Sequence, residues 1–231
     1  MNKIIKARKK ILLGGFIATA ILGVVLFSDT GAQSATILIT WRTQTYVPRD
    51  FPGKALPIPG SPITASLEAI VGGKTADLSN TTIYWYLDGH QIGGGTGVWN
   101  MTLQAPSGSS GVASLRAQIE NLAGARVAKT IYIPVVSPEA IIESPYYNGQ
   151  FSGESANVKA MPYFFSVADP SRLSFSWLVN GESSKNSGNP DELSVKAGGS
   201  DSGTAINIFL TITNPLGASE SALTGITLKR K

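Results

Sequence analysis

The sequence predicts an all-β chain with two tandem β-sandwich domains, because of a repeat, a periodicity and a composition. The repeat is a short phrase: YWYLDG at 84–89 returns as SWLVNG at 176–181. The periodicity is an alternation in two longer stretches, 114–124 and 207–217, where every second residue is apolar. This pattern is typical of strands with one face buried and the other exposed. The composition includes 25 glycines and 13 prolines with only 15% charged residues, which favours short strands joined by turns.

The first segment in chain order is a basic head (1–10) followed by an apolar run. The head carries five cations and no acid, and the run from Ile11 to Phe27 carries no charge. A helix of this length approaches the ~30 Å of a hydrocarbon core, so we expect a single transmembrane helix over 11–28. Cations before such a run place the N-terminus in the cytoplasm and the later residues outside the cell membrane. A cleaved signal peptide is the open alternative, because Ala32–Ser34 offers small residues where a signal peptidase reads.

The first sandwich domain is expected over residues 36–133. TILITWRT (36–43) predicts its opening strand, and ITASLEAIV (63–71) predicts the second. Five prolines between residues 48 and 62 keep the intervening chain extended, so we expect a crossover along the sandwich edge. A polyproline-type ligand is the alternative that this composition leaves open.

The second sandwich domain is expected over residues 140–228. It follows the linker PVVSPE (134–139), whose two prolines predict a short, semi-rigid connection and a stalk-like arrangement with limited bending. In each domain the repeated phrase places a tryptophan, Trp85 or Trp177, at an inward strand position. The Asp-Gly or Asn-Gly pair that follows supplies the positive φ angles of a tight hairpin turn.

The order of features in each copy resembles an immunoglobulin-like sandwich, in which a tryptophan of the third strand packs between the sheets. It also resembles the PKD-type domains of bacterial surface proteins. The chain departs from both, because it lacks the FGDG turn and the later His-x-Tyr of PKD domains and the cysteine pair of immunoglobulin domains. The segments 40–57 and 133–151 are similar to membrane-anchored envelope proteins of reduced-genome bacteria. That resemblance implies an envelope location and carries no activity.

Several function classes are excluded or disfavoured by the composition. There is no cysteine, so disulfides and thiol chemistry are excluded. Eight of the 19 basic residues lie in the first ten and last three positions, which leaves an acidic body without the electrostatic footprint of nucleic-acid binding. The stretches GGKT (72–75) and GGGTG (93–97) lack the spacing of phosphate-binding motifs and are expected to be loops.

No catalytic, cofactor or metal site is predicted. His90 is the only histidine, and we interpret it as an exposed turn residue because no activated serine motif accompanies it. Calcium binding by NPDE (189–192) with Asp201 is the metal alternative, although no EF-hand-type loop is present, and a solvated acidic loop is favoured. A prepilin-like reading of Gly14–Phe16 and a hydrolase that uses carboxylates alone are the minor alternatives.

The sequence therefore predicts a non-catalytic, membrane-anchored surface protein that presents or spaces a binding surface at the cell envelope. Its partner would be an envelope protein or, as the alternative, a glycan; self-association is compatible with the pattern. If Trp85 and Trp177 point into the cores, neighbouring side chains point outward and form the candidate protein-binding face. These residues are Tyr84, Tyr86, Arg116, Leu178 and Phe209.

Overall fold

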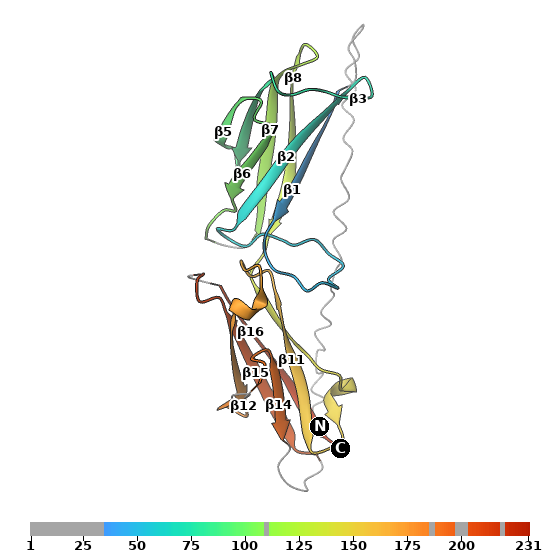
Figure 1. Cartoon of the computed structure of the whole chain (residues 1–231), viewed down its shortest axis with the longest axis vertical. Coiled ribbons are helices and arrows are strands. Elements are labelled where there is room, and N and C mark those ends of the chain that lie inside the picture. Colours follow the sequence, from blue (N-terminus) through green and yellow to red (C-terminus); the bar gives the residue numbers. More distant parts are fainter. Residues whose placement is uncertain (1–34, 109–110, 185–187, 197–202, 218–219) are drawn as a thin grey trace, which may run out of the picture.

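The protein contains two β-sandwiches that follow each other along the chain, as seen in a computed structural model that describes residues 35–108, 111–184, 188–196, 203–217 and 220–231 (Figure 1). The all-β prediction is confirmed, because every regular element of these residues is a strand apart from two short 3-10 helices. No helix of the described residues is long and apolar enough to cross a membrane. The predicted transmembrane span, 11–28, lies outside the described residues.

The first sandwich contains two antiparallel sheets. One sheet has the order β1-β2-β3, with β6 also paired to β2, and the other has the order β5-β4-β7-β8. Its strands are β1 (Ala35–Thr43), β2 (Pro62–Val71), β3 (Lys74–Thr75), β4 (Thr82–Leu87), β5 (His90–Thr96), β6 (Asn100–Gln104), β7 (Gly111–Leu122) and β8 (Ala125–Val135).

The second sandwich repeats this plan with sheets of order β14-β11-β9 and β10-β16-β15-β12-β13, in which only β10 and β16 run parallel. Its elements are β9 (Glu139–Glu143), η1 (Tyr147–Gly149), β10 (Gln150–Phe151), β11 (Ser155–Tyr163), η2 (Pro170–Arg172), β12 (Ser174–Val179), β13 (Glu182–Ser184), β14 (Glu192–Lys196), β15 (Ala205–Thr213) and β16 (Ser221–Arg230). Between β8 and β9 only residues 136–138 lie outside strands.

The tryptophan strand and the long alternating strand are neighbours in each sandwich, β4 beside β7 and β12 beside β15. This is the immunoglobulin-like arrangement. Trp85 and Trp177 are both buried. The indole N–H of Trp85 donates to the Val98 carbonyl at 2.8 Å, and that of Trp177 donates to the Pro190 carbonyl at 3.0 Å, each thirteen residues ahead in the chain.

Each sandwich encloses its own apolar core. Alternate residues of the paired strands point between the sheets, and the two clusters share no buried residue. The largest fully buried side chains of the first core are Ile63, Leu67, Ile83, Trp85, Leu115, Ile119 and Ile133. Those of the second core are Phe151, Phe165, Leu193, Ile208 and Leu210.

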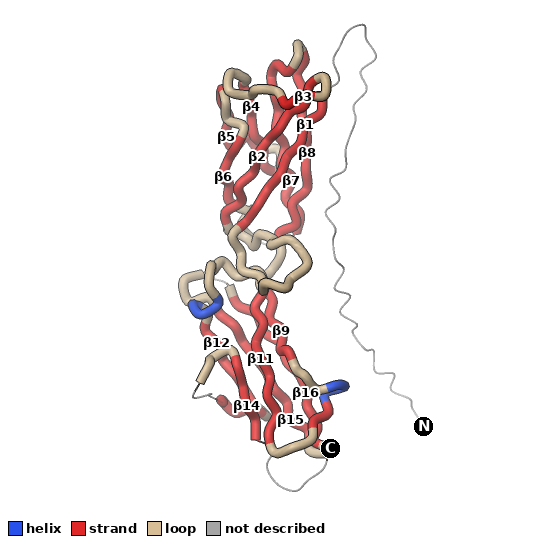
Figure 2. Tube along the Cα trace, turned by 45° about the vertical axis from the view of Figure 1, so that its right-hand side comes forward, coloured by secondary structure: helices blue, strands red, loops and turns tan. Residues whose placement is uncertain are grey.

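The proline-rich segment 44–61 connects β1 to β2 and also contacts the second sandwich. Tyr46 forms an isolated antiparallel bridge with Phe165, in which the Tyr46 N–H donates to the Phe165 carbonyl at 2.8 Å and the Phe164 N–H donates to the Tyr46 carbonyl at 2.7 Å. The Phe51 ring meets those of Tyr163 and Phe164 edge-on, with centroids 5.7 and 5.8 Å apart. In Figure 2 this segment lies at the junction of the two sandwiches.

The equivalent segment of the second sandwich stays within its own domain. There β10 pairs with the final strand β16, and the Lys231 N–H donates to the Phe151 carbonyl at 2.9 Å. In the first sandwich the Val136 N–H donates to the Pro57 carbonyl, also at 2.9 Å. The C-terminal part of segment 44–61 therefore contacts its own sandwich, whereas Tyr46 and Phe51 contact the second sandwich.

Both loop expectations were wrong in part. In GGKT (72–75), Lys74 and Thr75 form β3 and pair with Ile70 and Val71 of β2. GGGTG (93–97) was expected to be a loop, but Gly93 to Thr96 belong to β5 and pair with Thr82 to Trp85 of β4. The backbone alone makes these ladder bonds, so the missing side chains do not prevent pairing. A Cβ at Gly94, whose φ is 150°, would lie 2.7 Å from the Tyr84 ring, so the glycine leaves room for an aromatic side chain of the adjacent strand.

Candidate functional site

The candidate face of the first sandwich lies on the outer side of the β5-β4-β7-β8 sheet. Tyr86 on β4 is directly opposite Arg116 on β7, and the Arg116 guanidinium lies over the Tyr86 ring at 5.2 Å from its centroid. Tyr84, two residues earlier on β4, lies against Gly94. The structure therefore brings the three predicted residues together on one surface, with both tyrosines half-buried and Arg116 exposed.

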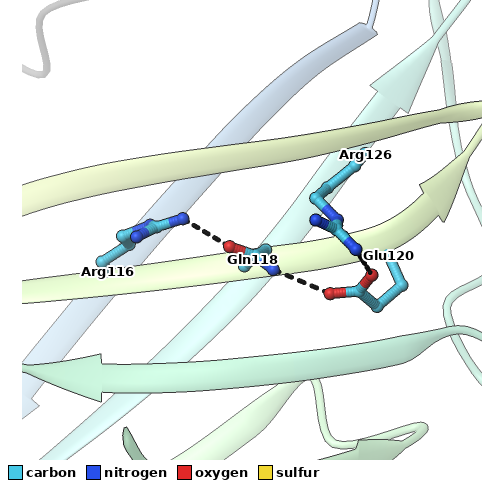
Figure 3. Close-up of polar contacts among 4 residues, drawn as sticks. All are labelled: Arg116, Gln118, Glu120 and Arg126. Atoms are coloured by element: carbon cyan, nitrogen blue, oxygen red, sulfur yellow. Dashed lines mark hydrogen bonds and ion pairs between the residues drawn. The ribbon is translucent and has the colours of Figure 1, made fainter. Parts of the chain in front are cut away.

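A hydrogen-bonded row of planar side chains extends this face along β7 (Figure 3). The Arg116 guanidinium donates to the side-chain oxygen of Gln118. The Gln118 amide nitrogen donates to Glu120 Oε1 at 2.7 Å, and Arg126 Nε on β8 donates to Glu120 Oε2 at 2.9 Å. Because residues two apart on a strand point to the same side, Arg116, Gln118 and Glu120 line up without any turn or loop. We call these four residues the polar row.

The polar row fixes the charge of its acid. The hydrogen bond from Gln118, followed by that from Arg126, holds the pKa of Glu120 below its ordinary value. A glutamate with an ordinary pKa is already ionised at neutral pH, and the lowered pKa means that Glu120 stays ionised, and keeps accepting from its two donors, in more acidic solution as well. A row of this kind offers guanidinium and amide groups with restricted side-chain freedom, which lowers the entropic cost of binding a polar ligand.

Tyr132 on β8 belongs to the same face and was missed in the sequence. It is 71% exposed and lies opposite Ser114 of β7. The alternation in ARVAKTIYI (125–133) contains the signal that could have identified it, because Ile131 and Ile133 alternate with Tyr132. An exposed tyrosine beside an arginine is a composition that protein interfaces favour.

The candidate face of the second sandwich lies on the outer side of the β16-β15-β12-β13 sheet. Leu178 and Phe209 are directly opposite each other on β12 and β15 and are 38% and 45% exposed. The Phe209 ring lies over Gly225 of β16, where an added Cβ would come within 2.7 Å of it. Leu223 of β16, at 71% exposure, was missed by the sequence reading and joins them.

The remaining candidates do not assemble into a reactive site. His90 is exposed at the start of β5. Asp191 and Glu192 of the NPDE stretch face Lys159, with Lys159 Nζ 3.7 and 3.6 Å from their carboxylates. Asp201 lies outside the described residues. Within the described ranges, no group of three or more histidine and acidic residues is arranged to hold a metal ion.

A shallow hollow of about 630 Å³ lies next to Lys159 on the outer side of β9, β11 and β14. Charged and polar residues, among them Glu143, Asn157, Glu192 and Ser194, line it together with Pro145, Val158 and Leu193. Its acids are at least partly balanced by Lys159, so it has the character of a solvated surface depression.

No protein-family model matches the sequence, and no curated protein matches it. Among solved structures, the fibronectin(III)-like modules of Clostridium thermocellum CbhA are similar at 17% identity over 84% of this chain and 93% of that chain, with a TM-score of 0.28. Three N-terminal domains of the highly immunogenic outer capsid protein of bacteriophage RB49 match at 15% identity over 85% of this chain and 59% of that chain, with a TM-score of 0.45. The mouse nectin-like molecule 4 ectodomain matches at 15% identity over 83% and 65%, with a TM-score of 0.35. These likenesses concern the fold alone.

Proposed function

We propose that the protein is an exported, membrane-anchored, non-catalytic immunoglobulin-like protein that presents a binding surface at the cell envelope. The observation that carries the proposal is the outer face of the first sandwich, where the polar row lies beside Tyr84, Tyr86 and Tyr132. Aromatic and arginine side chains that are already ordered before binding are the usual anchors of an interface.

The course of the chain supports a role in spacing as well as binding. Anchored by residues 11–28, the chain would enter the first sandwich at Ala35, at the opposite end of β1 from the crossover that contacts the second sandwich. The first sandwich would then stand next to the membrane and the second would point away from it. Contacts of Tyr46 and Phe51 with the second sandwich limit bending at this junction, as a spacer requires.

An envelope protein is the partner that we propose first, because Tyr and Arg dominate the face. A carbohydrate is the second candidate. It is favoured by the Tyr84 ring, which lies along the sheet over Gly94, beside planar amide, guanidinium and carboxylate groups that suit the hydroxyls of a sugar.

The test is co-sedimentation of the protein with isolated bacterial envelope fractions. Replacing Arg116 and Tyr86 together by alanine should reduce binding at least about tenfold, a loss of about 1.4 kcal/mol, while the melting temperature stays within a few degrees. Arg42→Ala is the matched control, because Arg42 is an exposed arginine on the opposite sheet of the same sandwich. Equal binding by the double variant and the control would refute the proposed face.

The anchored orientation has its own measurement. Protease added to intact cells should digest both sandwiches and leave the basic head protected by the membrane. Survival of the sandwiches alongside an intact cytoplasmic marker protein would show that the orientation is wrong.

The binding assay with purified glycans in place of envelope fractions distinguishes a carbohydrate ligand from a protein partner.

A further inference from the structure

The outer face of the β16-β15-β12-β13 sheet carries no charge in its centre. The outward residues of β12, β15 and β16 are serine, threonine, asparagine, glycine, alanine and large apolar residues, apart from Lys229 at one end. Three exposed apolar side chains, Leu178, Phe209 and Leu223, lie in its centre. We call this surface the neutral face.

The neutral face is also flat. Phe209 lies between Leu178 on one side and Gly225 on the other, and one edge of its ring lies over the glycine, while 45% of the residue remains exposed. In the adjacent row, Thr211 separates Ser176 from Leu223. A level surface with short side chains around an apolar centre is suited to packing against another sheet, as in the interior of a sandwich.

The other outer faces of the described residues carry charge. The sheet on the far side of the second sandwich carries Glu143, Lys159 and Glu192, and the first sandwich carries the polar row. Packing the neutral face on either of these would remove water from charges without offering them partners, which is unfavourable. Packing it on its own equivalent in another molecule brings the apolar centres together and leaves Lys229, at one end of the face, as the one charged outward residue of β12, β15 and β16.

We propose that the neutral face binds the neutral face of a second copy of this chain, related by a two-fold axis near Phe209. A two-fold contact uses the same residues on both sides, so a surface whose centre is free of charge is complementary to itself. This inference goes beyond the proposed function, because it assigns a homotypic contact to the second sandwich and leaves the polar row of the first for a different ligand.

The size of the face predicts a weak contact. β15 has nine residues, which span about 30 Å at ~3.4 Å per residue, and three or four strands spaced ~4.8 Å apart give a width of about 15–19 Å. Each copy would therefore bury roughly 500 Å², or roughly 1,000 Å² in total, which is below the range of stable complexes. Copies held in one membrane would meet at a high effective concentration, which compensates for weak affinity. This last step rests on the proposed anchor.

The absence of cysteine makes a direct test possible. The full chain carrying Ser176→Cys has one thiol on the neutral face, and the full chain carrying Ser194→Cys has one on the opposite sheet of the same sandwich. Both are reconstituted in phosphatidylcholine vesicles and treated with a short bismaleimide. We expect the dimer yield from Ser176→Cys to exceed that from Ser194→Cys by about tenfold, as a preference of about 1.4 kcal/mol would give.

Two further variants test whether the apolar centre drives the contact. Adding Phe209→Ser and Leu178→Ser to Ser176→Cys should lower the dimer yield to that of Ser194→Cys. Adding Leu216→Ser, a leucine that is 86% exposed outside the neutral face, should leave it unchanged. Equal yields from the two thiols, no dimer from Ser176→Cys, or no effect of the serine pair would each overturn the proposal. Vesicle flotation measures separately whether the chain is anchored in the membrane. If the chain does not float with the vesicles, the dimer yields of the cysteine variants are compared at high protein concentration in detergent solution.

Discussion

At the scale of single residues, the repeated phrase is explained by a turn that is tied to the neighbouring strand. Asp88 and Asn180 adopt positive φ angles of 48° and 52°, each before a glycine. The Asp88 N–H donates to the Ser114 carbonyl at 2.9 Å, and its side-chain oxygen accepts from the Ser114 N–H at 2.8 Å. Asn180 makes the same pair of bonds to Asn207, at 2.8 and 2.9 Å.

This geometry predicts which substitutions the turn tolerates. Asp88→Asn should change the free energy of unfolding by less than about 0.5 kcal/mol, because the second sandwich uses asparagine for the same bonds. Asp88→Ala should cost about 1–3 kcal/mol, since the Ser114 N–H loses its acceptor and a residue without a polar side chain must keep a left-handed conformation. Urea unfolding of residues 35–231 provides the measurement.

The reciprocal changes in the second sandwich are the controls. Asn180→Asp should be tolerated and Asn180→Ala should not, with the loss confined to the unfolding transition of that sandwich. If Asp88→Asn were as costly as Asp88→Ala, the carboxylate charge, and not the hydrogen-bond geometry, would be what the turn requires.

At the scale of secondary-structure elements, segment 44–61 distinguishes the two otherwise similar sandwiches. Thr45 Oγ1 donates to the Leu56 carbonyl at 2.7 Å and joins the two halves of the segment, and Lys54 Nζ lies 3.5 Å from the centroid of the Trp41 ring on β1, a contact with the first sandwich. Burial lowers the pKa of Lys54 from its ordinary value. The segment therefore holds Phe51 in a fixed position against Tyr163 and Phe164.

Removing the Phe51 ring should loosen the junction without unfolding either sandwich. Phe51→Ala deletes two edge-to-face contacts worth about 0.5–1.5 kcal/mol each, while the Tyr46 to Phe165 backbone bridge remains. We expect the distribution of distances between labels on Ser114→Cys and Ser194→Cys to broaden, measured by spin-label spectroscopy. Tyr147→Ala, which removes an exposed aromatic ring elsewhere, should leave the distribution narrow. An unchanged distribution in Phe51→Ala would mean that the backbone bridge alone fixes the junction.

The strands also show which parts of the fold could be predicted from the sequence. Strands with strict alternation, such as β7 and β15, were predictable because one face of each is buried in its own sandwich. β5 was not, since its Gly93 to Gly95 stretch carries no side-chain pattern and pairs through the backbone. The contact of Phe51 with Tyr163 was not predictable either, because it joins residues more than a hundred positions apart in different domains, where no periodicity operates.

The same reasoning applies to the candidate faces. Tyr86 and Arg116 could be assigned to one surface from alternation alone, because both lie on strands whose partners were recognised. The bond from Arg126 to Glu120 depends on the register of β7 and β8, which shifts between Ile119 and Leu122. An irregularity of this kind has no sequence period, so the place of Arg126 in the polar row emerges only in three dimensions, whereas the alternation of β7 already puts Arg116, Gln118 and Glu120 on one side.

At the scale of the whole molecule, the two sandwiches combine separate cores with a shared junction. No buried residue belongs to both clusters, but Tyr46 of the first sandwich packs against the core of the second. Each sandwich should therefore unfold independently, and unfolding of one should destabilise the other only through the contacts of segment 44–61. The four tryptophans allow this to be measured, because Trp177 is the one in the second sandwich and Trp41, Trp85 and Trp99 lie in the first.

Trp177→Ala tests this arrangement. The change should cost about 3–5 kcal/mol, a large part of the roughly 5–10 kcal/mol expected for a domain of this size, so the second sandwich should unfold at much lower urea. Every remaining tryptophan then reports on the first sandwich alone. Circular dichroism, which follows both domains, should show two transitions, and fluorescence should follow only the later one.

The position of that later transition measures the coupling between the domains. Losing the second sandwich removes the partners of Phe51 and Tyr46, so the first sandwich should be destabilised slightly, by about 1–2 kcal/mol. In a Phe51→Ala background much of this shift should already be present, and adding Trp177→Ala should move the fluorescence transition less. If fluorescence and circular dichroism instead showed one common transition at low urea, the two cores would not be separate folding units, and the crossover would have to be regarded as part of a single core.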